Sequence, residues 1–304
     1  MTKIKHTLSS IKIGKIILYV VMIGIAFVFL YPFIYMIVNS LMTNEDLNNF
    51  SVTWIPRKIN FANYSMAANI IKYFSNFKNS LIITILATLG QLISCSMAGY
   101  AMARFKNKAN NVLFIVMILA ILVPVQTIIV PEYLFYSNIG WLNTYAPMVI
   151  PSWFGYGLNG ALYIFIFRQF YLGFPKSVEE AAKVDGCGFL RVFFNIVFPV
   201  SKSSYVVVLV LALVFHWNNS YEPAMFLSEK SMHTVPMGLE NIIYTLSLPP
   251  EIMSSSYGIN ADNSLNNAVL MAGVFMVVLP ILIAFCFLQK MFIQGIEHTG
   301  LTGE

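Results

Sequence analysis

Charged side chains are scarce in this sequence of 304 residues, because only 10% are Asp, Glu, Lys or Arg while 58% are hydrophobic. In soluble domains about a quarter of all residues are charged, so the composition excludes an ordinary soluble protein. A bilayer-crossing helix needs roughly 20 apolar residues, and lipid offers the backbone no partners outside a helix or a closed barrel. Six stretches without charge meet this length, and we predict an all-α integral membrane protein with six transmembrane helices, in 16–44, 79–103, 109–131, 133–167, 203–221 and 263–289.

Groups that a catalytic or metal site would need are also missing. The three cysteines, Cys95, Cys187 and Cys286, have no metal-ligand or disulfide spacing. The six stretches contain no Asp or Glu and no H-E-x-x-H motif, which argues against a membrane-embedded enzyme. No G-x-x-x-x-G-K-[ST] phosphate loop occurs, so ATP binding by that route is not expected. We therefore expect no enzyme activity, no metal and no cofactor on this chain.

Positive charge is distributed unevenly between the predicted loops. With the amino terminus inside, the inner segments hold 13 of the 18 Lys and Arg residues, as cytoplasmic loops usually do. Both termini are therefore predicted to be cytoplasmic, with a basic tail at 1–15, a permease domain at 16–292 and a carboxyl-terminal tail at 293–304. The basic residues form no stripe, so the net charge of +5 reflects topology and not nucleic-acid binding.

One inner loop, 175–199, has a pattern of its own. Ser177 and Glu180 have the spacing of a capping box, which predicts a short helix starting at Ser177. Gly186 can adopt the left-handed conformation that ends such a helix. A second short helix is expected over 189–195, followed by Pro199 at the first turn of the next span.

This loop resembles the EAA loop of ABC importer permeases, which inserts into a cleft on the ATPase subunit. The pattern is Glu-Ala-Ala from Glu180, then Gly186, Ile196, Phe198 and Pro199, and only Phe198 departs from the usual leucine. The resemblance assigns ATPase coupling to Glu179, Glu180, Ala181, Ala182, Asp185, Gly186, Ile196 and Pro199.

Further segments extend the resemblance over nearly the whole chain. They are Asn60-Phe61-x-Asn63-Tyr64, Ala98-x-Tyr100-Ala101-x-Ala103-Arg104, Pro124-x-Gln126-Thr127, Gly140-x-Leu142-Asn143-Thr144, Trp217-Asn218, Pro236-x-Gly238-Leu239 and Leu288-Gln289-Lys290-x-Phe292. Together they are similar to the maltose-permease G-subunit group of carbohydrate importers with the type I permease fold. The resemblance implies a second homologous permease, two ATPase subunits that bind ATP and Mg, an extracytoplasmic solute-binding protein, and a prokaryotic cell membrane.

Polar residues within the predicted spans are candidates for the solute pathway, because hydrocarbon disfavours them. We select Gln126, Asn159, Trp217, Asn218 and Asn219, since amides can bind sugar hydroxyls and an indole offers an apolar face. Structural hydrogen bonding between helices is the competing interpretation for each of them. His216 is expected to be structural.

The outer segment 228–267 reads as a loop, and by similarity its part 249–263 is expected to reach into the binding protein. Two alternatives stay open: a channel that works alone, and an importer of the same type for a non-sugar solute such as glycerol phosphate or a polyol.

Overall fold

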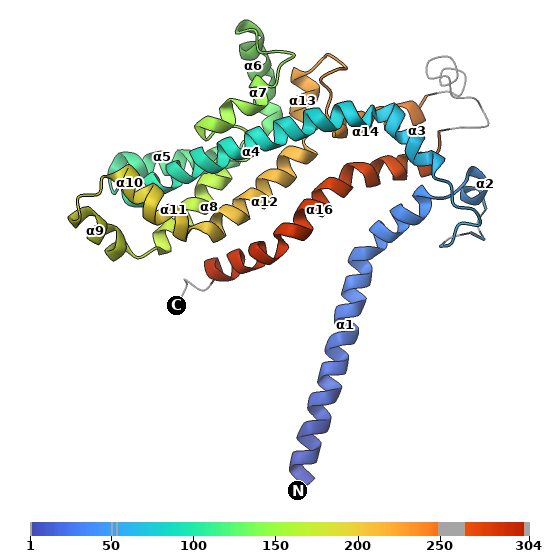
Figure 1. Cartoon of the computed structure of the whole chain (residues 1–304), viewed down its shortest axis with the longest axis horizontal. Coiled ribbons are helices and arrows are strands. Elements are labelled where there is room, and N and C mark those ends of the chain that lie inside the picture. The colour runs from blue at the N-terminus through green and yellow to red at the C-terminus, as the bar shows by residue number, and fades with distance from the viewer. Residues whose placement is uncertain (1, 50, 53, 249–264, 301–304) are drawn as a thin grey trace. The chain divides into compact units, whose positions relative to one another are not determined.

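The computed structural model describes residues 2–49, 51–52, 54–248 and 265–300, and all regular secondary structure in these ranges is helical (Figure 1). The chain divides into two compact units. Unit 1 comprises residues 1–70 and 241–277, and unit 2 comprises residues 71–240 and 278–304. The all-α prediction is thus confirmed for the described residues.

Unit 1 contains a long amino-terminal helix and two shorter ones, α1 (Thr2–Ser40), α2 (Asn44–Leu47) and α3 (Ala62–Ile71), of which Ile71 already belongs to unit 2. The side chain of Asn63 on α3 donates to the carbonyls of Ser40 and Met42, at 2.8 and 2.9 Å. These bonds satisfy carbonyls at the end of α1, which the helix itself leaves without partners. Helices α14 (Val235–Leu246) and α16 (Asn267–Gly300) extend from one unit into the other.

Unit 2 is built around α4 (Tyr73–Arg104), which packs against α8 (Gly160–Gly173) and α12 (Lys202–Asn218) (Figure 1). Helices α5 (Lys108–Ile121) and α6 (Val125–Asn138) precede α7 (Ala146–Val149) and η1 (Pro151–Phe154). At one end of α4 lie α9 (Lys176–Val184) and α10 (Phe189–Val192), followed by η2 (Phe193–Val197) and α11 (Phe198–Val200). Helices α7 and α13 (Tyr221–Phe226) lie beside the amino-terminal half of α4, where Met148 and Phe226 share a hydrophobic cluster with Ile83.

The small-residue face of α4 makes its close packing possible. Gly90 lies against Trp153, and the Ser94 hydroxyl donates to the Ser152 carbonyl at 2.8 Å. Gly99 faces Phe167 so closely that no side chain fits between the two backbones. Small residues allow such approach between membrane helices, where van der Waals packing replaces the hydrophobic effect.

The predicted spans agree with the structure only in part. Among the described residues, three helices can cross a membrane alone, over Ile13–Ser40, Tyr73–Arg104 and Asn267–Gln294. Two further spans are possible if bent pairs count as one each: α5 with α6, bent by 102°, and 189–200 with α12, bent by 79°.

The stretch 133–167 is interrupted, as the proline and glycines within it predict, and does not form one continuous helix. Helix α6 ends at Asn138, and Pro151, Gly155 and Gly157 interrupt the chain before α8 begins at Gly160. Both glycines have positive φ, 74° and 93°, which a helix cannot accommodate. At 14 residues α8 is about 21 Å long, which is short for a bilayer of about 30 Å.

The prediction that 228–267 is a loop is wrong in its first half. Helix α14 forms at Val235–Leu246, with Pro236 in its first turn and Val235, Met237 and Ile242 buried. Proline suits this position because the amide it lacks has no helical partner there. The expectation for 249–263 falls on residues outside the described ranges.

The contact at Gly99 gives a stability prediction. A methyl group there would lie 2.7 Å from Cβ of Phe167 and 3.0 Å from the Ile164 carbonyl oxygen. We expect Gly99→Ala to lower the free energy of unfolding by about 1–3 kcal/mol through overpacking. The matched change Gly24→Ala in α1 has no atom within 4 Å and should leave stability equal or higher. Thermal unfolding of the purified protein in detergent measures both, and equal melting temperatures for the two variants would contradict the packing argument.

Candidate functional site

The loop 175–199 folds as a helical knob at the end of α4 (Figure 1). Helix α9 begins at Lys176, within a residue of the predicted start, and ends before Gly186, whose φ is 80°. The Cys187 amide donates to the Ala182 carbonyl at 3.0 Å and closes the helix end. The sequence thus predicted this helix and its glycine stop correctly. The expected second helix is present from Phe189 but continues through η2 and α11 to Val200.

Glu179 attaches the knob to α4. Its carboxylate accepts from Nε of Arg104 at 2.7 Å and from the Tyr100 hydroxyl at 2.9 Å, and it also forms an ion pair with the Arg104 Nη2. The same nitrogen donates to the Phe174 carbonyl, at the start of the loop, at 3.2 Å. Glu179 is only 2% exposed. Buried ions are tolerated when they are paired and hydrogen-bonded, as they are here.

Aromatic rings surround this ion pair and exclude water from it. The Tyr100 ring packs against Phe189, Phe193 and Tyr171 at centroid separations of 4.9, 5.2 and 5.5 Å. Phe189 and Phe193 belong to the helical segment after α9, so the rings hold the second half of the knob as the ion pair holds the first. Both halves of the loop are therefore fixed to α4.

The resemblance-derived coupling residues separate into two groups by exposure. Glu179 and Ala182 face the protein interior, and Ile196 is half-buried. The exposed group consists of Glu180, Ala181, Asp185, Gly186 and Pro199, of which Glu180 and Asp185 are charged.

Sequence reasoning missed the partners of Glu179. Arg104 was used only in the positive-inside pattern and in the resemblance, and Tyr100 only in the resemblance. Each is at least 75 residues from Glu179 in sequence, so no spacing motif joins them. The usable signal was a lone arginine at the end of an apolar span beside a loop rich in glutamate.

The five pathway candidates lie in different local settings. Gln126 on α6 and Asn218 at the end of α12 are exposed, while Asn159 has a left-handed φ of 58° just before α8. Trp217 is buried and packs edge-on against Phe77, at 5.5 Å between ring centroids. Asn219 donates to the Glu222 carboxylate at 2.7 Å. Trp217 and Asn219 thus have structural contacts.

His216 has the structural role that was expected of it. Its Nε2 lies 2.8 Å from the Gln91 Oε1, and the Gln91 amide donates to the Leu158 carbonyl at 2.7 Å. This buried chain of hydrogen bonds joins α12, α4 and the segment before α8.

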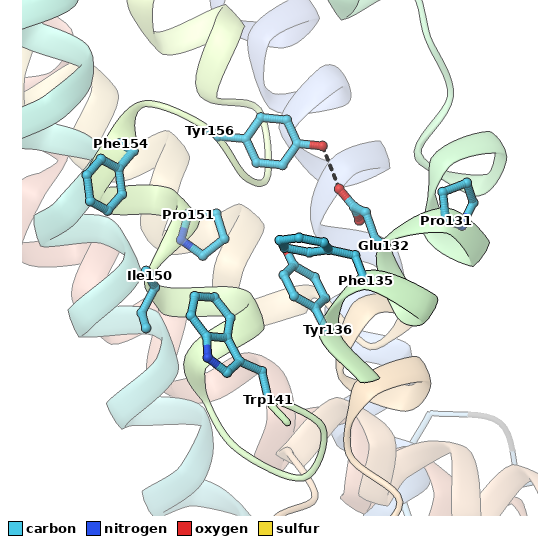
Figure 2. Close-up of a pocket in the computed structure, with 9 residues that line it drawn as sticks. All are labelled: Pro131, Glu132, Phe135, Tyr136, Trp141, Ile150, Pro151, Phe154 and Tyr156. Atoms are coloured by element: carbon cyan, nitrogen blue, oxygen red, sulfur yellow. Dashed lines mark hydrogen bonds between the residues drawn. The ribbon is translucent and has the colours of Figure 1, made fainter. Parts of the chain in front are cut away.

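A cleft of about 560 Å³ opens between α6 and the segment that contains η1 (Figure 2). We call it the aromatic cleft. Its lining residues are Pro131, Glu132, Phe135, Tyr136, Trp141, Ile150, Pro151, Phe154 and Tyr156.

Within the aromatic cleft, one carboxylate faces a set of rings. Figure 2 shows the Tyr156 hydroxyl directed at Glu132, to which it donates at 2.5 Å. The Tyr136 and Trp141 rings stack at 5.7 Å with 11° between their planes. Beside the cleft, burial raises the pKa of Glu222 to about 7; the hydrogen bond from Asn219 opposes this shift and the Glu132 carboxylate adds to it. Sequence reasoning did not select any of these lining residues.

Comparisons with known proteins agree with this architecture. The chain is 28% identical over 282 residues to the arabinooligosaccharides transport system permease protein AraQ of Bacillus subtilis (strain 168), covering 92% of each protein. It is 31% identical over 278 residues to the melibiose/raffinose/stachyose import permease protein MelC of the same organism, covering 90% of the chain and 91% of MelC.

A solved structure shares the fold. It is the crystal structure of a bacterial ABC transporter involved in the import of the acidic polysaccharide alginate, with a TM-score of 0.76 and 21% identity, covering 92% of this chain and 96% of that one. Residues 95–298 match the family described as binding-protein-dependent transport system inner membrane component. The chain belongs to this family of ABC transport permeases, which are membrane components that depend on a solute-binding protein and are not enzymes.

Proposed function

We propose that this chain is a permease subunit of an ATP-driven importer for a sugar or oligosaccharide and forms half of the translocation pathway. The named cargoes of AraQ and MelC, both saccharides, support this choice. The second half is a homologous permease, and two ATPase subunits bind ATP and Mg. Both termini and the loop 175–199 face the cytoplasm, in accord with the distribution of Lys and Arg. A bilayer-spanning bundle of six segments includes 133–167 as an interrupted segment.

The anchored knob is the observation that carries the coupling role. Glu180 and Asp185 extend from a helix whose other side is fixed to α4 by Glu179. An ATPase that binds the exposed face therefore moves α4 together with α9, because the buried ion pair and the ring cluster join these two helices. Movement of α4 would then carry α8 and α12, which pack against it, between inward-open and outward-open arrangements.

The aromatic cleft suits a neutral sugar better than an anion. Sugar rings present C–H faces that pack on Trp141 and Phe154, and their hydroxyls can donate to the Glu132 carboxylate, which has lone pairs beyond the one used by Tyr156. A glycerol phosphate would meet that carboxylate as a like charge. The cleft therefore favours the sugar importer over the glycerol phosphate alternative.

Replacing the exposed glutamate tests the docking role. Glu180→Gln should leave the melting temperature unchanged, because exposed substitutions usually alter stability by less than about 0.5 kcal/mol. It should weaken ATPase binding by roughly ten- to a hundredfold if the carboxylate accepts a charge-assisted hydrogen bond. Titration of the reconstituted permease pair with its ATPase measures this affinity. If Glu180→Gln binds the ATPase with wild-type affinity, Glu180 is not part of the docking surface.

The matched change at the neighbouring buried glutamate should have the opposite pattern. Glu179→Gln leaves the Arg104 guanidinium buried without a counter-charge, which costs about 3–5 kcal/mol. We expect a clear fall in the melting temperature and faster amide hydrogen exchange over 176–184, with Glu180→Gln as the control. Unchanged exchange in Glu179→Gln would show that the ion pair does not hold α9.

The aromatic cleft is tested by removing the Tyr156 hydroxyl or the Glu132 charge while keeping the shape of the cleft. Tyr156→Phe and Glu132→Gln should each raise the KM for uptake about tenfold and leave kcat nearly unchanged, because a lost hydrogen bond to a charged group costs about 1.5–3 kcal/mol. Uptake of labelled arabino-oligosaccharides and raffinose by proteoliposomes supplies the measurement. Tyr133→Phe, on α6 but outside the cleft, is the control. Equal KM values in all variants would exclude the cleft as a solute contact.

A further inference from the structure

A second cleft, of about 550 Å³, lies in unit 2 where α4 ends and α5 begins, and we call it the basic cleft. Three cations line it, Lys106, Lys108 and Arg168, and the other lining residues are Met102, Ala103, Phe105, Asn107, Asn110, Asn111 and Leu172. The cleft thus combines positive charge with amide groups. It also receives the amino-terminal end of α5, whose dipole favours an anion.

Within the described part of the chain, no carboxylate forms an ion pair with the cations of the basic cleft. The Arg168 guanidinium stacks on Phe114 at 3.8 Å from the ring centroid, and its Nε is buried with no hydrogen-bond partner among the described residues. The ammonium of Lys106 lowers the pKa of Lys176, the first residue of α9, so the two like charges lie close together.

The neighbouring carboxylates do not neutralise this cluster. Glu179 is already engaged by Arg104 and Tyr100. Glu180 acts on Lys176, where it opposes the effect of Lys106 only in part. Like charges held together without a counter-ion raise the free energy of a fold, so an anion in the basic cleft would stabilise it.

The surface next to the cleft indicates where the anion comes from. Asn110 and Asn111 belong to the first turn of α5, and the helix continues with Val112, Leu113 and Val116, each more than half exposed. A headgroup phosphate in the basic cleft would therefore place its acyl chains along an apolar helix face. A free phosphate would use the cations but not this face.

We propose that the basic cleft binds the phosphate of an anionic phospholipid, with Lys106, Lys108 and Arg168 around the headgroup and the acyl chains along α5. The bound lipid would hold the α4–α5 turn next to α9, the helix that we assign to ATPase docking. The lipid site depends on the chain being a membrane permease, which its family shows. It does not depend on the proposed sugar cargo or on the docking role of Glu180.

Lipid retention by the assembled importer tests the site. The complex is purified in detergent, exchanged into mixtures of phosphatidylglycerol and phosphatidylcholine, and examined by native mass spectrometry for bound lipid. The test variant is Lys106→Gln with Lys108→Gln, which spares the packed Arg168 side chain. The control is Lys202→Gln with Lys290→Gln, which removes the same charge from two exposed residues outside the cleft.

We expect the wild type and the control to retain phosphatidylglycerol preferentially, and the test variant to bind it roughly thirty-fold more weakly, given the contribution of each lysine near an anionic surface. Equal retention by the test variant and the control would overturn the site. A parallel arm measures binding of radiolabelled inorganic phosphate. Phosphate binding that depends on Lys106 and Lys108, without any preference for phosphatidylglycerol, would overturn the lipid assignment.

Discussion

The ion pair between Arg104 and Glu179 is the interaction on which the account of this permease depends. It joins the end of the longest helix in unit 2 to a short helix that the chain would otherwise present on a flexible loop. Two charges buried together are favourable only when their geometry is good and their remaining donors are satisfied. Tyr100 and the Phe174 carbonyl supply further bonds, while the Arg104 Nη1 is buried without a partner among the described residues. In the proposed coupling role, the knob transmits a pull through the bonds that Glu179 accepts.

Hydrogen bonds also fix the amino-terminal end of α4. The Asn79 amide donates to the carbonyls of Ser231 and His233, both at 2.9 Å, and its oxygen accepts from the Tyr145 hydroxyl at 2.7 Å. The Ser80 hydroxyl accepts from the Val235 amide at 2.8 Å. Between the two ends, Gln91 links α4 to α12 and to the segment before α8. Polar side chains thus connect α4 to the knob, to the middle of the bundle and to the segment before α14.

The sequence predicted those parts of the fold that arise from local chemistry. Charge-free length located the helices, and Gly186 located the end of α9 because only a residue tolerant of positive φ fits there. The break in 133–167 likewise follows from local residues, Pro151, Gly155 and Gly157. The sequence could not show the contacts that distant residues make. The burial of Glu179 and the exposure of Glu180 could not be separated, because Arg104 stands 75 residues away.

In the candidate site, too, the sequence predicted the features that local residues determine and missed those that distant residues determine. Helix α9 and its stop at Gly186 follow from the motif, whereas the aromatic cleft brings together α6, Trp141 and the residues around η1, which no short pattern connects. Intramembrane amides were reasonable pathway candidates because polar side chains are energetically unfavourable in hydrocarbon. Trp217 and Asn219 instead make structural contacts, with Phe77 and Glu222. The side chains around the cleft come from α6 and from the interrupted stretch that follows it, and none of them was among the pathway candidates.

The central claim is that α9 and α4 move as one body when the ATPases close. Spin labels at the exposed positions Leu89 on α4 and Val184 on α9 report the distance between the two helices by double electron–electron resonance in the assembled importer. We predict the same distance distribution in the nucleotide-free and ATP-bound states, while a label pair that joins Val184 to the partner permease changes its distance. A shift of the Leu89–Val184 distribution on ATP binding would contradict the account.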